Sequence, residues 1–294
     1  MSRNSRIILN LITMKNSLLV KCAFTAIVLL FFFLIPVSAA VNDKGYRHIQ
    51  DISYVSESET DLYRIERCKL DIYYPENVDK FATIVWFHGG GLEGGSKGLR
   101  DEFRSRGFAV VDVNYRLFPK AKCPAYIDDA AMAVAWVFNH IAEYGGTPEQ
   151  IYVGGHSAGG YLALMVTLAE EYMEKYGADA DRIVKAYPVS GQTTTHYAIR
   201  AERGISRDLP VIDHMAPSNN VKKEGAPIVL ITGDRNLEMM ARYEENAHLY
   251  ALLKHFGHPA WLYELQGCDH VSVLGPACYI IRDDIMRQWK AFSK

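Results

Sequence analysis

The chain reads Ile151-Tyr152-Val153-Gly154, then Gly155-His156-Ser157-Ala158-Gly159, and then Gly160-Tyr161-Leu162-Ala163-Leu164. The first part is typical of a buried strand and the last part of a buried helix. The pattern G-x-S-x-G between them predicts a sharp strand-to-helix turn, in which small residues let the backbone lift the Ser157 hydroxyl above a sheet. The pattern is short enough to arise by chance, so the prediction depends on the strand and helix around it. Ser157 is therefore the candidate nucleophile.

Apolar runs alternate with helical patterns on both sides of this stretch. Further strands are predicted over Cys68–Tyr74, Thr83–Phe87, Ala109–Tyr115, Val184–Val189, Ile228–Thr232 and Ala260–Leu265. Helices are predicted over Arg100–Arg106, Ile127–Tyr144, Gly160–Tyr176, Arg242–Phe256 and Ala277–Phe292. This alternation indicates a mainly parallel sheet with helices on both faces. Ligands of such sheets bind at the carboxyl ends of the strands, where Ser157 is expected to lie.

A second glycine-rich motif, His88-Gly89-Gly90-Gly91, directly follows the strand that ends at Phe87. Acyl transfer builds negative charge on an oxygen atom and needs preorganised N–H donors there. The motif and the residue after the nucleophile predict an oxyanion hole from the amides of Gly90, Gly91 and Ala158. The general base is expected late in the chain, and His270 lies just past the last predicted strand. His88 and His156 belong to the motifs themselves and are expected to be structural.

These motifs resemble a known group of enzymes. The residues that carry the resemblance are Trp86–Gly91, Val113–Leu117, Pro124-Ala125, Asp129, Trp136 and Gly155–Gly160. Over roughly residues 70–294 the chain resembles bacterial esterases and lipases related to hormone-sensitive lipase, and feruloyl-esterase-like carbohydrate esterases. The resemblance implies the α/β-hydrolase fold and hydrolysis of short acyl esters, such as acetyl or feruloyl groups on carbohydrate. It also implies that the stretch from Tyr115 to Asp129 braces the site.

The triad acid is expected after the strand that ends at Thr232, and three positions compete. Related enzymes often place it three residues after a glycine such as Gly233, but that position holds Asn236, which carries no charge. Counting back from the next helix places Glu238 at the acid position. Asp234 is the alternative acid. An acid elsewhere, or none, also stays open.

The segment 191–225 interrupts the alternation and contains two prolines, Pro210 and Pro217. It predicts a short insertion that borders the site within a single catalytic domain over residues 41–294. His196 in this segment is a candidate substrate contact, and the alternative is a histidine exposed on the surface.

Residues 1–40 hold four basic and no acidic residues, an apolar run from Ala23 to Val37 and the small residues Ser38-Ala39-Ala40. This order predicts a signal peptide cleaved near Ala39 or Ala40, and hence a secreted or periplasmic protein without a stable membrane anchor. An uncleaved anchor is the alternative. The remaining chain has a formal charge of −6. Its four cysteines, Cys68, Cys123, Cys268 and Cys278, are either disulfide-bonded or buried thiols.

The sequence contains no zinc motif of the H-E-x-x-H kind, no paired cysteines at zinc spacing and no basic patch. We therefore expect no metal, no cofactor and no nucleic-acid partner, and a small-molecule or carbohydrate ester as substrate. A thioesterase, a lactonase, an exopeptidase of the same fold and a non-catalytic binding protein on this scaffold are the alternatives.

Overall fold

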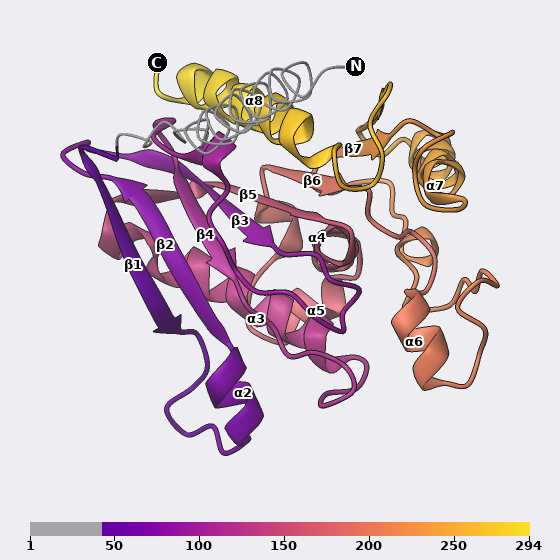
Figure 1. Cartoon of the computed structure of the whole chain (residues 1–294). Helices are drawn as coiled ribbons and strands as arrows, with labels where there is room; N and C mark the ends of the chain where they lie inside the picture. Colours follow the sequence, from indigo (N-terminus) through magenta and orange to yellow (C-terminus); the bar gives the residue numbers. More distant parts are fainter. Residues whose placement is uncertain (1–42) are drawn as a thin grey trace, which may run out of the picture. The chain divides into compact units, whose positions relative to one another are not determined.

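An eight-stranded sheet organises the computed structural model, which describes residues 43–294. The strand order is β1-β2-β4-β3-β5-β6-β7-β8. The strands β3 to β8 run parallel, and β1 and β2 form an antiparallel edge (Figure 1). The mainly parallel sheet of the prediction is therefore confirmed. The strands are β1 (Tyr46–Ser53), β2 (Lys69–Pro75), β3 (Phe81–Phe87), β4 (Ala109–Val113), β5 (Gly146–His156), β6 (Lys185–Val189), β7 (Ile228–Gly233) and β8 (Ala260–Leu265).

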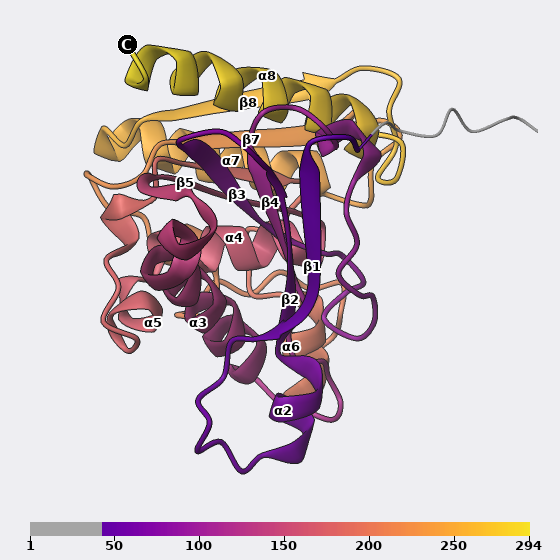
Figure 2. The ribbon, with the colours of Figure 1, turned by 90° about the vertical axis from the view of Figure 1, so that its left-hand side faces the viewer.

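Helices cover both faces of this sheet (Figure 2). The long C-terminal helix α8 (Leu274–Phe292) packs on one face, together with the short turn η1 (Asp101–Phe103). The opposite face is covered by α3 (Ala125–His140), α4 (Ala158–Leu168), α5 (Glu170–Glu174) and α7 (Arg242–Phe256), with η2 (Ile141–Tyr144) extending α3 and η3 (Ala180–Arg182) following α5. The central strand β3 is buried along its whole length, which is why its sequence is continuously apolar.

Two local predictions were wrong, and two elements were missed. The predicted helix at 100–106 is only the three-residue turn η1, because the backbone at Arg104 is extended and Ser105 has a positive φ. The predicted helix at 160–176 breaks at Ala169, which separates α4 from α5. The strand β1 and the helix α2 (Leu62–Arg67) were missed, because β1 is mostly exposed and lacks an apolar pattern.

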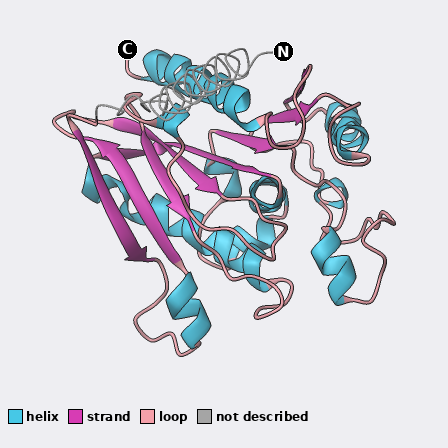
Figure 3. Cartoon of the chain, in the orientation of Figure 1, coloured by secondary structure: helices cyan, strands magenta, loops and turns pink. Residues whose placement is uncertain are grey.

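The segment 191–225 connects β6 to β7 and contains α6 (Tyr197–Glu202) and the turn η4 (Pro217–Asn219). Figure 3 shows α6 in the long connection, separate from the helices that pack on the sheet. No helix between Asp43 and Lys294 is long and apolar enough to cross a membrane. The predicted signal peptide lies outside the described residues.

Candidate active site

Ser157 lies in a strained turn between β5 and α4. Its backbone angles are φ 55° and ψ −117°, a conformation that side chains rarely adopt. The glycines on either side make this turn possible: a Cβ at Gly159 would overlap the Phe87 carbonyl, and a Cβ at Gly155 would overlap the backbone of Gly159. The turn therefore presents the Ser157 hydroxyl at the carboxyl end of β5, as the motif predicts.

His270 lies in the loop between β8 and α8 and contacts Ser157. Its Nε2 is 2.9 Å from the Ser157 Oγ, and its Nδ1 is 2.5 Å from Glu238 Oε1. The structure thus brings together three predicted residues from the loops that follow β5, β7 and β8. A hydroxyl, an imidazole and a carboxylate in this order form the geometry of a serine triad.

The carboxylate of Glu238 is buried and hydrogen-bonded on both oxygens. Its Oε2 accepts from the Ser190 hydroxyl at 2.6 Å and from the Gly233 amide at 3.2 Å, and its Oε1 accepts from the Met239 amide at 3.0 Å. Burial raises the pKa of Glu238, but the hydrogen bonds from His270, Ser190 and Met239 outweigh it and hold the pKa at about 2. The group is therefore an anion that can stabilise a protonated imidazole.

Asp234, the alternative acid, faces a different set of partners. Its Oδ1 accepts from the backbone and side-chain amides of Asn236 at 2.9 and 3.1 Å, and its Oδ2 accepts from the Gly267 amide at 3.0 Å. These backbone bonds lower its pKa. Asp234 thus shapes the turn after β7, and Asn236 is exposed. Among residues 43–294, the carboxylate that contacts His270 is that of Glu238.

The glycine motif places free amides beside Ser157. Gly90 and Gly91 have φ values of 111° and 68°, which favour glycine, and a Cβ on the preceding Gly89 would contact the Ser157 Cβ. Within the described chain, the Gly90 and Gly91 amides donate no hydrogen bond. Ala158 is the first residue of α4, so its amide has no acceptor in the helix. All three predicted donors are therefore available to a ligand.

The two motif histidines support this arrangement. His88 stacks on Tyr115 with ring centroids 4.3 Å apart, and the Tyr115 hydroxyl donates to the His88 carbonyl at 2.7 Å. His156 Nε2 lies 2.7 Å from the His270 carbonyl, so this nitrogen must carry the proton and donate it. Burial lowers the pKa of both histidines to about 4, which keeps both rings neutral near neutral pH. His156 thereby ties the His270 loop to the turn that holds Ser157.

His196 does not occupy the place expected for it. The side chain is buried, with 1% of the residue exposed, and its Nδ1 accepts from the Ala198 amide as the N-cap of α6. Its ring lies against those of Tyr161 and Tyr197. Burial lowers its pKa well below the usual value. Neither an exposed histidine nor a substrate contact fits this position, because the capping bond and the two rings enclose it.

Tyr197 also lies beside the site, although no sequence pattern singles it out. A Cβ on Gly91 would overlap the Tyr197 hydroxyl, so this hydroxyl lies directly against the oxyanion loop. Within residues 43–294 it has no hydrogen-bond partner. A tyrosine in an insertion looks like any other apolar residue in the sequence, and its position follows from the folding of α6 against the loop.

Four cysteines of the described chain, Cys68, Cys123, Cys268 and Cys278, are free thiols. Cys68 and Cys278 are buried, and burial is the largest cause of the raised pKa of each. The sequence left open whether these cysteines form disulfides or are buried thiols, and in the structure they are buried or partly buried thiols. The described residues contain no cluster of His, Cys, Asp and Glu side chains that could hold a metal ion.

Residues 70–252 match the family model named BD-FAE. The chain belongs to the BD-FAE family. The matched range contains Ser157, Glu238 and the glycine motif, and it ends before His270.

Relatives in sequence include esterases of several kinds. The chain is 41% identical over 108 residues to carboxylesterase NlhH of Mycobacterium tuberculosis, covering 34% of each protein. It is 34% identical over 119 residues to a "probable isoprenylcysteine alpha-carbonyl methylesterase" of Oryza sativa, covering 39% of this chain and 28% of the relative. The match thus spans about a quarter to a third of the length of these relatives.

Solved structures share the fold over most of the chain. A truncated carbohydrate esterase from gut microbiota superimposes with a TM-score of 0.69 at 18% identity, covering 84% of this chain and 98% of that one. Esterase B of Lactobacillus rhamnosis gives a TM-score of 0.65 at 19% identity, covering 85% and 87%. With the sheet order described above, these likenesses show that the BD-FAE chain has the α/β-hydrolase fold.

Proposed function

We propose that this BD-FAE protein hydrolyses carboxylic esters through an acyl-enzyme on Ser157. The observation that supports this proposal most strongly is the chain of contacts from Ser157 through His270 to Glu238, at 2.9 and 2.5 Å. Free amides at Gly90, Gly91 and Ala158 lie beside it. A nucleophile, a base with its acid, and oxyanion donors are the parts that acyl transfer requires.

The reaction proceeds in two halves. His270 Nε2 takes the proton of Ser157 as its Oγ attacks the ester carbonyl, and the resulting oxyanion accepts hydrogen bonds from the three amides. The protonated imidazole, stabilised by Glu238, then gives its proton to the departing alcohol. Water, activated by the same imidazole, attacks the acyl-enzyme and releases the acid.

The substrates we propose are short acyl esters, such as acetyl or feruloyl groups on carbohydrate. The gut-microbiota protein that shares the fold with a TM-score of 0.69 is described as a carbohydrate esterase. The segment between β6 and β7, residues 190–227, is only 38 residues long. A short insertion covers the site less than a large cap does and leaves room for a bulky alcohol.

Replacement of Ser157 with Ala tests the mechanism. We expect the variant to lose ester hydrolysis by a factor on the order of 10⁶ in turnover while keeping its fold. The measurement is turnover on p-nitrophenyl acetate, acetylated sugars and feruloyl esters, with circular dichroism as the control for folding. A fluorophosphonate should label Ser157 in the unmodified protein. A variant that kept a tenth of the activity would contradict the proposal.

A further inference from the structure

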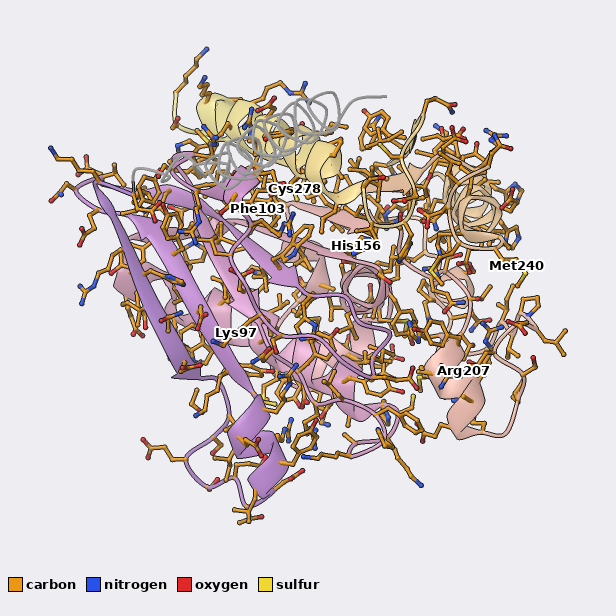
Figure 4. The ribbon with its side chains drawn as sticks, viewed as in Figure 1. Lys97, Phe103, His156, Arg207, Met240 and Cys278 are labelled. Atoms are coloured by element: carbon orange, nitrogen blue, oxygen red, sulfur yellow. The ribbon has the colours of Figure 1, made fainter. Side chains whose placement is uncertain are left out.

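A pocket of about 310 Å³ lies between the insertion and the loop before α7. Arg207, which lies in the insertion, and Met240, which precedes α7, both line it and lie on the same side of the described chain (Figure 4). The wall from the second segment includes the exposed side chains of Met239 and Met240. Apolar walls with a few polar groups are typical of pockets that bind small molecules.

This pocket shares its walls with the proposed site. Tyr197, which lines it, lies with its hydroxyl against Gly91 of the oxyanion loop. Arg207 forms an ion pair with Glu93 of the same loop at 2.6 Å. On the opposite wall, Met239 donates its amide to Glu238. A substrate bound at Ser157 can therefore extend one end into this pocket.

Two of the three arginines that line the pocket already have acidic partners. Arg207 pairs with Glu93 through both of its terminal nitrogens. Arg242 lies 3.0 Å from Glu245 and donates to the Ser190 carbonyl at 2.7 Å. Their charges are balanced without a ligand.

Arg200, the third, lacks such a partner. Only 3% of the residue is exposed, and the one hydrogen bond of its guanidinium within the described chain is donated by Nη1 to the Leu209 carbonyl. Its Nε is buried without a partner, and no carboxylate of the described residues forms an ion pair with it. Burial is the largest cause of its lowered pKa and Arg242 adds to it, whereas the charges of Glu245 and Asp208, which also line the pocket, raise the pKa without balancing the effect of burial. A buried guanidinium without an anion is costly, and the cost falls when a carboxylate reaches it.

We propose that this pocket binds a free carboxylate of the substrate, with Arg200 as its receptor. The planar guanidinium keeps two unused nitrogens, Nε and Nη2, which match the two oxygens of a carboxylate. The inference rests on the proposed esterase function and narrows it to esters that carry an acid group. That group belongs either to the acyl part, as in a half-ester of a dicarboxylic acid, or to the alcohol part, as in a sugar acid.

Two matched pairs of substrates distinguish a carboxylate on the acyl part from one on the alcohol part. The acyl pair is p-nitrophenyl hemiglutarate against p-nitrophenyl valerate, and the alcohol pair is an acetylated methyl glucuronide against the acetylated methyl glucoside. We expect the acid member of one pair to be favoured in kcat/KM by about tenfold or more, since a site built for a polar group rejects the analogue without it. Replacement of Arg200 with Gln should remove this preference, because it lowers kcat/KM for the acid member toward the value for its neutral partner measured on the same variant.

Arg203→Gln is the matched control, because Arg203 also lies at α6 but pairs with Asp213 and does not line the pocket. It should keep the preference. Arg200→Lys, which keeps the charge without the planar fork, should keep part of it. Neutral esters preferred in both pairs, or a preference that survives Arg200→Gln, would overturn the proposal while the esterase function stands.

A binding measurement separates this proposal from the esterase function. Glutarate or methyl glucuronide should raise the melting temperature of the Ser157→Ala protein, whereas methyl glucoside should not, and Arg200→Gln should abolish the rise. If the unmodified protein hydrolyses no ester, this shift still decides whether the pocket binds a carboxylate. No shift with either acid would refute the proposal.

Discussion

The position of Glu238 beside His270 depends on the conformation of the loop after β7. The amides of Leu237 and Glu238 both donate to the Asp234 carbonyl, at 2.8 and 2.9 Å, so the chain turns once after β7 before it reaches Glu238. In this turn Asn236 is exposed and its side chain bonds to Asp234, whereas Glu238 reaches His270. The spacing before α7 was enough to make Glu238 a candidate. The turn itself depends on Asp234 accepting the Gly267 amide from a distant loop, and no local pattern reveals that contact.

Glu238→Gln should therefore be far more damaging than Asp234→Asn. An amide cannot stabilise the protonated imidazole, and the matching change in a serine protease costs about 10⁴ in turnover. Asp234→Asn should act mainly on the turn and cost much less. Asn236→Asp should bring no gain, because this side chain is exposed and does not contact His270. The measurement is turnover of the three variants on one soluble ester. An inactive Asp234→Asn variant together with a nearly normal Glu238→Gln variant would show that the triad acid is misassigned.

Among the elements, the buried strands and long helices could be predicted and the irregular ones could not. Strand β3 and helix α7 follow from continuous apolar runs and from a helical stretch that ends at Gly257, a residue with φ 79°. The helix α6 has no such signal, since its position depends on His196 capping it and on Tyr197 lying against the oxyanion loop. Contacts between segments far apart in the sequence decide this part of the site.

The contact between α6 and the glycine motif gives a prediction for a pair of residues. Gly91→Ala should reduce kcat by tenfold or more, because the new methyl group overlaps the Tyr197 hydroxyl and the φ of 68° strains alanine. Tyr197→Phe alone should cost less. The double variant should recover part of the loss, since the hydroxyl that collides is gone. The measurement is kcat of the unmodified protein, the two single variants and the double variant, which gives the coupling between residues 91 and 197. Strictly additive losses would contradict the contact between them.

Strand β4 contains a buried acid that lowers stability. Both oxygens of Asp112 lack a hydrogen-bond partner within the described chain, and burial, with Asp71 on the neighbouring strand, raises its pKa to about 7. The unfolded chain loses this proton near pH 4, so the free energy of unfolding falls as the pH rises from about 4 to about 7.

Asp112→Asn should therefore stabilise the protein by on the order of a few kcal/mol at pH 8 and by little at pH 4, because the amide stays neutral at both. Urea unfolding at the two pH values is the measurement. Asp79→Asn, at an exposed position, is the control and should change neither value. An equal effect of Asp112→Asn at both pH values would mean that the acid does not titrate in this range.

For the whole molecule, the alternation of strand and helix patterns predicted the class of fold and its layers. The α/β-hydrolase fold follows from motifs placed after the strands now labelled β3 and β5. Residues 191–225 lie between β6 and β7, and the pocket that they line with the loop before α7 could not be foreseen. Arg200 and Glu245 are ordinary charged residues in the sequence, and only the folded chain shows that both are largely buried beside the site.

We propose that the protein is exported, because residues 1–40 have the charge and apolar pattern of a signal peptide. Expression of the full chain in a bacterium should yield a mature protein that begins near residue 40 or 41 and lies outside the cytoplasm. Intact-mass measurement of the purified protein reads the new N-terminus. Replacing Ala39 or Ala40 with a bulky residue should slow processing, and a chain retaining its first 40 residues in the cytoplasm would contradict the proposal.

The two contacts between the insertion and the oxyanion loop also bear on how such an enzyme can be re-engineered. Because residues 191–225 form one continuous segment between two strands, a chimera could exchange them for the matching segment of another esterase. However, the Tyr197 hydroxyl needs glycine at 91, and Arg207 needs Glu93 as its partner. A chimera that exchanges residues 191–225 alone would disturb the oxyanion amides that activate the ester. An active chimera therefore has to include the matching oxyanion loop as well.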